Sequence, residues 1–443
     1  MSSASAGPSS QSLIERSRRS TAAEIYDIGT RFPGVYESAE GSWMRDFQGN
    51  RCLDVTAASG ALLLGNRDPQ IVDAICQSIQ RHGSMFASTL SMPRIELAER
   101  LCDWFPCGEK AVFGKTGSEA TLAAVRLARA ATGRDLVLTC GFHGWHDWHL
   151  RYLKLGYDPP TGVVCFGYNE TYLERLLDEF SDRIAAVFIT PEPAWFDAEV
   201  MRRWSALCAS HDVLFMIDEV VTAFRYGPHG VNGTGEVPAD LITISKGLAN
   251  GHSLAAVIGR RDLIDAYDDA GVAGTYTREV PPMAAALKVL DIIADGSVHE
   301  RCQRLGTTLM EGMRDVLKAV GIPAWLAGPS MMFDVVVGSE QLSWDIYRAA
   351  FDHGAWFEDS GTHMVTAAFG DAEVQHAIDA FEQGARRIAE RDGFDGGEIG
   401  EERRREFARE AFGGALVDDE ELLACVERTV GEIAAHAPSE ARV

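Results

Sequence analysis

The 443-residue chain lacks the features of several protein classes. No apolar run approaches the roughly 20 residues that a membrane-spanning helix needs, so we expect no membrane association. The nine cysteines are odd in number and scattered, with no Cys-x-x-Cys pair, which predicts reduced thiols rather than a disulfide framework or a zinc site. The first twenty residues hold no apolar run after their basic residues, so we expect no secretory signal and a cytoplasmic protein.

Positive charge is also scarce. The 41 Lys and Arg face 65 Asp and Glu, which gives a formal net charge of −24 and a pI near 4.9. Such a chain repels phosphate backbones and anionic lipid surfaces, and it has no basic helix-turn-helix, so we expect no nucleic-acid or membrane partner. Cations are the natural partners of an acidic surface, although solubility alone explains the same excess.

What the sequence does contain is an alternation of helical periodicity with short apolar runs. The runs lie at 111–113, 136–139, 163–166, 186–190, 214–217, 241–244 and 255–259. Near-continuous apolar strands separated by amphipathic helices predict an α/β fold with a mostly parallel sheet covered on both faces.

Shifts in this pattern predict four regions. They are an N-terminal segment (1–67), a large domain (68–297), a smaller α+β domain (298–389) and an acidic helical tail (390–443). The helical spacing of apolar residues in the tail predicts that it packs on the smaller domain or on a partner subunit.

Two of the strands are followed by segments suited to a phosphate and a planar ring. Thr116-Gly-Ser118 opens a helix, where backbone N–H groups and the helix dipole can seat a phosphate, although a simple helix cap explains the same pattern. Phe142 and His143 lie in a loop bracketed by glycines, where aromatic rings can lie flat against a ligand. The histidines at 143, 146 and 149 have no cysteine or carboxylate at ligand spacing, so we expect no metal.

Two further strands end in residues of opposite charge. Asp218 directly follows four apolar residues, and a buried carboxylate there needs a partner, either a ligand or a neighbour such as Arg225. Lys246 follows another buried strand and precedes a glycine, which makes it a candidate for Schiff-base formation, although lysines more often extend to the surface.

The four segments make sense together. Ligands of α/β sheets sit at the carboxyl ends of the strands, so we expect the segments to form one site. A phosphate seat, an aromatic plate, a buried carboxylate and a nucleophilic lysine are the set that pyridoxal 5′-phosphate (PLP) requires.

The same motifs resemble those of the class III, fold-type I aminotransferases, in particular the glutamate-1-semialdehyde aminomutase branch. The resemblance runs from about Gly41 to Gln383. Its markers are Asp46-Phe-Gln-Gly-Asn-Arg51, Thr116-Gly-Ser-Glu-Ala120, Phe142-His-Gly144, Pro191-Glu-Pro193, Asp218-Glu-Val220, Ser245-Lys-Gly247 and Gly274-Thr275.

The resemblance implies roles for the matching residues. Lys246 would be the Schiff-base lysine, and Asp218 the partner of the cofactor's ring nitrogen. The other cofactor contacts would be made by Thr116, Gly117 and Ser118 at the phosphate, Phe142 and Val220 on the two sides of the ring, and His143 and Glu192 near it. Thr275 would reach the phosphate of the neighbouring subunit, which implies a homodimer with shared sites.

Departures from the aminomutase pattern bear on the substrate. The run Gly247-Leu-Ala-Asn-Gly251 is closer to true transaminases than the family's Gly-Gly-Gly run. With Glu279 at its position, the sequence looks more like the sequences of family members that act on sugars. Arg31, in the region of the arginine that grips a substrate carboxylate, is out of register, which argues against a simple amino acid as the specific substrate.

Acidic residues are predicted at the mouth of the site instead. They are Asp147, Glu279, Glu358 and Asp359. Carboxylates beside aromatic residues suit a polycationic amino sugar. We therefore expect a PLP-dependent aminotransferase of aminoglycoside or related antibiotic biosynthesis, with Glu or Gln as amino donor. The alternative is an aminomutase, epimerase or eliminating enzyme that uses the same site without net amino transfer.

Overall fold

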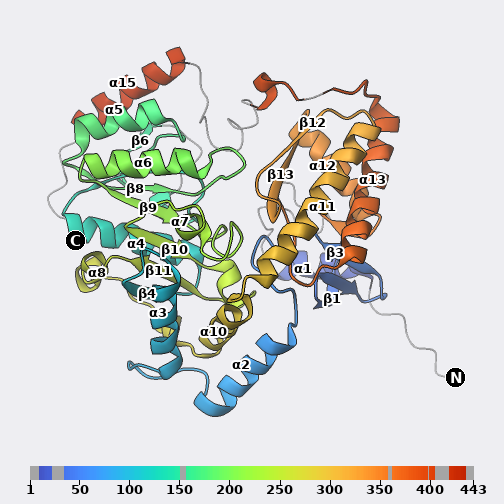
Figure 1. Ribbon diagram of the computed structural model, residues 1–443, viewed down its shortest axis with the longest axis horizontal. Coiled ribbons are helices and arrows are strands. Elements are labelled where there is room, and N and C mark those ends of the chain that lie inside the picture. Colours follow the sequence, from blue (N-terminus) through green and yellow to red (C-terminus); the bar gives the residue numbers. More distant parts are fainter. Residues whose placement is uncertain are drawn as a thin grey trace. The chain divides into compact units, whose positions relative to one another are not determined.

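A computed structural model of the chain describes residues 9–21, 34–149, 156–357, 362–397, 399–404 and 419–435. The chain divides into two compact units, each with its own helices and sheets (Figure 1). Gln70–His299 and Gly400–Val443 form the larger unit, and Met1–Pro69 and Glu300–Ile399 form the smaller one. No helix among the described residues is long and apolar enough to cross a membrane.

The larger unit is built on one eight-stranded sheet. Its strands, in spatial order, are β4 (Lys110–Gly114), β11 (Ala255–Gly259), β10 (Leu241–Ile244), β9 (Leu214–Asp218), β8 (Ile184–Ile189), β5 (Leu136–Cys140), β7 (Val163–Cys165) and β6 (Gly156–Asp158). The five strands from β10 to β7 run parallel, while β11 and the edge strand β6 run antiparallel to their neighbours. Every residue of β5, β8, β9, β10 and β11 is buried, as in a sheet covered on both faces. The predicted α/β fold with a mostly parallel sheet is confirmed.

Helices cover this sheet. The helices of the larger unit are α2 (Pro69–His82), α3 (Met92–Trp104), α4 (Gly117–Thr132), η1 (Asp147–His149), α5 (Glu170–Phe180), α6 (Ala198–Ser210), α7 (Gly230–Gly233), η2 (Lys246–Ala249), α8 (Arg261–Ile264), α9 (Tyr267–Ala270), η3 (Thr275–Arg278), α10 (Pro281–Ile293) and α15 (Asp419–Ala435). The inner face of α4 is rich in alanine and packs with Val137, Phe188 and Met216 of three neighbouring strands. Small side chains let α4 approach the sheet closely, which fixes the start of this helix beside the strand ends.

Helix α15 of the acidic tail also belongs to the larger unit. Tyr172 Oη of α5 donates a hydrogen bond to Thr429 Oγ1 of α15 (2.6 Å), and Arg183 Nη1 donates to the carbonyl of Ile433 (3.1 Å). The prediction that this tail packs on the smaller domain or a partner subunit was wrong for this helix. Its buried residues, among them Val426 and Ile433, pack over α5 and β6 instead.

The smaller unit holds two short sheets and four helices among its described residues. One sheet orders β1 (Tyr36–Glu40), β2 (Trp43–Asp46), β3 (Arg51–Asp54) and β14 (Ala355–Trp356), and the other orders β12 (Ala324–Ala327), β13 (Met332–Val337) and β15 (Thr362–Met364). The helices are α1 (Ser10–Ser20), α11 (Ser297–Ala319), α12 (Glu340–Phe351) and α13 (Asp371–Asp392).

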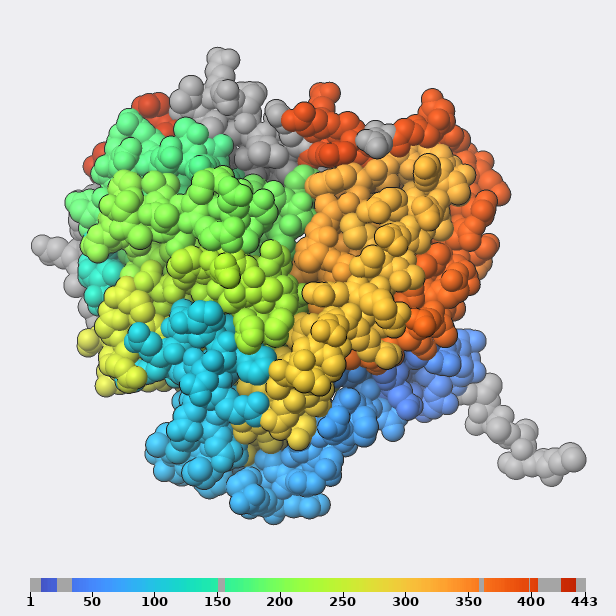
Figure 2. All heavy atoms as spheres, in the orientation of Figure 1, coloured from blue at the N-terminus to red at the C-terminus, as the bar shows by residue number. Residues whose placement is uncertain are grey.

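Glycines let the helices of the smaller unit pack closely. A Cβ at Gly312 of α11 would lie 2.3 Å from Ile378 of α13, and one at Gly384 of α13 would lie 3.2 Å from the Cβ of Ala350 on α12. The three helices form a continuous outer surface of this unit (Figure 2).

Candidate active site

A buried carboxylate lies at the end of the central strand β9. Asp218 is only 3 % exposed. Its Oδ1 accepts hydrogen bonds from Thr243 Oγ1 (2.9 Å) and from the N–H of Val220 (3.1 Å), and its Oδ2 lies 2.9 Å from His143 Nδ1. Arg225, the alternative partner considered above, makes none of these contacts. The carboxylate is therefore fixed by groups from β10, from its own loop and from the loop after β5.

His143 is itself held from several sides. Its ring stacks on Phe188 with centroids 4.3 Å apart, and its carbonyl accepts a hydrogen bond from Thr121 Oγ1 (2.6 Å). Thr190 Oγ1 donates to the carbonyl of the preceding residue, Phe142 (2.9 Å). The Phe142 residue is 55 % exposed, so a solvent-accessible aromatic residue directly precedes the buried His143.

The start of α4 carries free hydrogen-bond donors. Thr116 is the N-cap, and its Oγ1 accepts a hydrogen bond from the N–H of Glu119 (3.3 Å). Within the described part of the chain, the N–H groups of Gly117 and Ser118 make no hydrogen bond. Two unpaired N–H groups at the positive end of a 16-residue helix dipole suit an anion.

Two glycines bring the three segments into contact. A Cβ at Gly117 would lie 2.9 Å from Cγ1 of Val220, the second residue after Asp218. A Cβ at Gly144, whose φ is +95°, would lie 2.2 Å from Ser118 Oγ. At each of these glycines, the backbone of one segment therefore lies against a side chain of another segment. A Cβ at either position would overlap that side chain, so glycine suits both positions.

Lys246 lies at the end of the strand next to β9. In the parallel pairing of β10 with β9, Thr243 is opposite Asp218, and Lys246 follows three residues later. The backbone of Lys246 has φ +44°, a conformation uncommon for a residue with a side chain, and the side chain is half-buried. Ser245 Oγ anchors this turn by donating to the carbonyl of Leu254 (2.8 Å).

The remaining predicted residues lie in varied settings. Glu192 is half-buried in the loop after β8, whereas Asp147 in η1 and Thr275 in η3 are exposed. Glu279 is not a free carboxylate, because Lys115 Nζ lies 2.6 Å from its Oε2. Arg31, Glu358 and Asp359 lie outside the described residues.

The residues present fit PLP. The two unpaired N–H groups and the Ser118 hydroxyl match its phosphate, the buried Asp218 matches a protonated ring nitrogen, and Lys246 offers an amine at the adjacent strand end. Among the described residues, no group of three or more histidines, cysteines or carboxylates could hold a metal ion.

A second buried carboxylate, Glu219, is the middle residue of the Asp218-Glu-Val220 motif, and the sequence did not predict a role for it. It is fully buried and accepts hydrogen bonds from Thr222 Oγ1 (2.6 Å) and the N–H groups of Val231 (2.9 Å) and Asn232 (2.7 Å). A Cβ at Gly230, where φ is +61°, would lie 2.4 Å from this carboxylate. Glu219 thus anchors the start of α7, 12 and 13 residues further along the chain, to the turn after β9.

Glu219 makes stability depend on pH. Burial raises its pKa from the ordinary 4.5 to about 7, despite the hydrogen bonds that lower it. The folded protein therefore binds a proton that the unfolded chain has lost between about pH 4.5 and 7, so this group lowers stability as pH rises through that window. We expect the urea midpoint of the wild type to fall more between pH 5 and pH 8 than that of Glu219→Gln.

The matched control is Glu236→Gln, which changes an exposed carboxylate of the same region. It should follow the wild-type pH profile. Identical pH profiles for Glu219→Gln and the wild type would contradict the raised pKa.

Comparisons with known proteins identify the family of this chain. The sequence pattern of the family described as aminotransferase class-III matches residues 26–150 and 167–384. The chain is 37 % identical over 355 residues to the 2'-deamino-2'-hydroxyneamine transaminase of Streptomyces kanamyceticus, covering 79 % of this chain and 89 % of that protein. It is 32 % identical over 361 residues to the glutamate-1-semialdehyde 2,1-aminomutase of Methanothrix thermoacetophila, covering 74 % and 82 %.

Solved structures show the same fold. The FumI protein of Sphingopyxis sp. MTA144, in a form containing PLP, superposes with a TM-score of 0.78 at 26 % identity, over 86 % of this chain and 97 % of that chain. An omega-transaminase from Sphaerobacter thermophilus superposes with a TM-score of 0.78 at 23 % identity, over 87 % and 99 %. The chain belongs to the class III aminotransferases and is a PLP-dependent aminotransferase of the fold-type I architecture.

Proposed function

We propose that this aminotransferase acts on amino sugars, moving an amino group from Glu or Gln to an oxidised sugar of an aminoglycoside-like molecule. The observation that carries this proposal is the similarity to the Streptomyces kanamyceticus transaminase, whose name specifies a neamine derivative. That similarity extends over 89 % of the relative and 79 % of this chain. The biological setting that fits best is antibiotic biosynthesis in the cytoplasm.

We assign the chemistry to Lys246 and Asp218. When bound, PLP supplies an aldehyde for covalent attachment and a ring that accepts electrons. Lys246 Nζ holds the cofactor and, once released, carries a proton away from the substrate carbon. Asp218 keeps the ring nitrogen protonated, and His143 holds the Asp218 carboxylate in place through the 2.9 Å contact.

The geometry of the surrounding loops supports the following cofactor contacts. Thr116, Gly117 and Ser118 bind the phosphate at the start of α4, while Phe142 and Val220 enclose the ring and Glu192 lies near it. Phe142 is exposed and Val220 is pinned beside Gly117, so both are in reach of a ligand seated on that turn.

A homodimer would complete the site. Thr275 is exposed and lines an open groove together with Leu90 and Arg278. Leu90 and Tyr276 are about two-thirds exposed, at 66 % and 65 %, which is unusual for large apolar side chains. A second copy covering this surface would bury them and bring Thr275 to the phosphate of the neighbouring site.

Recognition of a cationic sugar rests on carboxylates near the site. Asp147 is exposed in η1, three residues after Gly144, and is free to meet an ammonium group. Glu358 and Asp359 are further proposed contacts, and Arg31 is the proposed contact for the donor's carboxylate. Because Glu279 is paired with Lys115, it adds little net negative charge to this surface.

An aminomutase is the second candidate, favoured by the similarity to the Methanothrix enzyme. Both reactions begin by moving a proton at the amine-bearing carbon. In an aminotransferase the nitrogen passes through the cofactor from one substrate to a second one. In an aminomutase there is no net transfer of nitrogen to a second substrate.

A half-reaction separates the two candidates. With purified, PLP-loaded protein, we expect Glu or Gln alone to convert the bound cofactor to pyridoxamine 5′-phosphate, and an oxidised amino sugar to restore PLP. The cofactor is measured by its absorbance, and the keto acid is measured as a stoichiometric product. The variant Lys246→Ala should lose at least about 100-fold in the rate of this conversion, because no group remains to carry the proton.

Two outcomes would contradict the proposal. One is a cofactor that stays in the PLP form with every donor while glutamate 1-semialdehyde is isomerised. The other is a Lys246→Ala protein that converts the cofactor at the wild-type rate. A surface variant, Lys110→Ala, is the control for general damage from losing a lysine.

The close approach of Gly144 to Ser118 gives a test of the phosphate site. In Gly144→Ala the new Cβ must displace the Ser118 hydroxyl or the loop, so the PLP dissociation constant should rise at least about tenfold, corresponding to about 1.4 kcal/mol. Fluorescence or absorbance titration of the apoprotein measures it.

The matched control is Gly133→Ala. Gly133 ends α4 and has φ +68°, but nothing lies within 4 Å of the position of its Cβ. This variant carries the same backbone strain without the contact, and its PLP affinity should stay within about twofold of the wild type. An equal loss of affinity in both variants would contradict the placement of the phosphate beside Ser118.

A further inference from the structure

Lys115 is a junction between three segments of the larger unit. It directly follows β4 and directly precedes Thr116, the cap of α4. Its Nζ lies 2.6 Å from Glu279 Oε2, its carbonyl accepts a hydrogen bond from Ser253 Oγ (2.7 Å), and its N–H donates to Glu119 Oε2 (2.7 Å). Its side chain is only 14 % exposed.

One of these segments is the loop that follows Lys246. From η2 the chain turns through Asn250 and Gly251, both with positive φ (+45° and +87°), and reaches Ser253. The Ser253 hydroxyl then ties this loop to the Lys115 carbonyl. The lysine loop and the start of α4 are thus joined directly through the backbone of Lys115.

The other segment runs from Thr275 to Glu279. It is anchored along its length, because Arg94 Nη1 donates to the carbonyl of Thr277 (2.7 Å) and Arg278 Nη1 donates to Ser88 Oγ (2.6 Å). Glu279 also forms a backbone bridge with Met85. The Glu279 carboxylate therefore extends from a fixed base to Lys115.

The charges at the junction depend on each other. An exposed ion pair contributes little to stability, but this pair is not fully exposed. Lys115 is largely removed from water, and Glu279 is partly removed, with 36 % of its side chain exposed. Removing one partner leaves the other charge without its counterion next to the start of α4. The start of α4 also loses its side-chain link to the segment that carries Glu279.

We propose that Lys115 and Glu279 are positioning residues for the phosphate-binding turn. Their ion pair fixes the N–H groups of Gly117 and Ser118 relative to the loop of Lys246, so that the phosphate and the reactive amine are held at matching positions. This inference rests on the proposed assignment of the 116–118 turn to the PLP phosphate. Donors held within a few tenths of an ångström bind an anion far better than mobile ones.

The test is a cycle of Lys115→Met, Glu279→Gln and the double variant, with the PLP dissociation constant and the rate of PLP release as readouts. Each single variant should weaken PLP binding about tenfold. The double variant should lose no more than either single, because both remove the same interaction.

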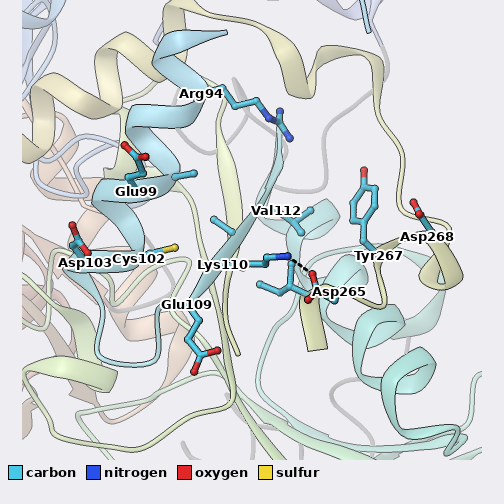
Figure 3. Close-up of a pocket in the computed structure, with 13 residues that line it drawn as sticks. Arg94, Glu99, Cys102, Asp103, Glu109, Lys110, Val112, Asp265, Tyr267 and Asp268 are labelled. Atoms are coloured by element: carbon cyan, nitrogen blue, oxygen red, sulfur yellow. Dashed lines mark hydrogen bonds and ion pairs between the residues drawn. The ribbon is translucent and has the colours of Figure 1, made fainter. Parts of the chain in front are cut away.

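The control is Lys110→Met on the same strand. Figure 3 shows Lys110 pointing to Asp265, with which it forms an ion pair in an open groove of about 850 Å³ lined by α3, β4 and the segment of α8 and α9. This pair lies at the opposite end of β4 from the turn, so breaking it should leave PLP affinity unchanged. The exchange Lys115→Glu with Glu279→Lys restores an ion pair and should recover at least part of the affinity, which a merely unfolded variant cannot do.

Three results would overturn the inference. They are wild-type PLP affinity in Lys115→Met, losses that add in the double variant, and tighter binding in Glu279→Gln. Tighter binding in Glu279→Gln would mean that Lys115, once it has lost its ion pair, attracts the phosphate by its charge and does not act by fixing the turn. If Gly144→Ala leaves the PLP affinity unchanged, the protein binds the phosphate at a different place. That result would overturn the proposed turn assignment as well as this inference.

Discussion

The arrangement of the site depends on burying the carboxylate of Asp218. A charge at the end of a central strand is costly unless its oxygens find partners. Here the partners are His143, Thr243 and the N–H of Val220. Because each comes from a different loop or strand, satisfying this one charge aligns the loop after β5, the end of β10 and the turn after β9.

Close packing extends that alignment to the phosphate turn. Val220 lies against Gly117, and Ser118 lies against Gly144, so the start of α4 cannot move independently of the loops that hold Asp218. On the far side of the turn, Lys115 connects it to the loop of Lys246 and to Glu279. The loop that follows Lys246, the Asp218 carboxylate and the start of α4 are therefore joined by direct contacts within the larger unit.

Much of this could be predicted from the sequence, because apolar strands and the residues directly after them are local signals. The strands around 136–139, 186–190, 214–217 and 241–244 are present, whereas the edge strand β6 was not predicted, because Gly156–Asp158 form no apolar run and are only partly buried. The seat of α15 on α5 and the pairing of Glu279 with Lys115 could not be predicted, because they join residues far apart in the chain.

The central claim is that Asp218, held by His143, keeps the cofactor's ring nitrogen protonated. The most direct measurement is the ¹⁵N NMR shift of ring-labelled PLP bound to the wild type and to Asp218→Asn. We expect a protonated nitrogen across neutral pH in the wild type and an unprotonated one in the variant. A ring nitrogen with the same protonation in both proteins would contradict it.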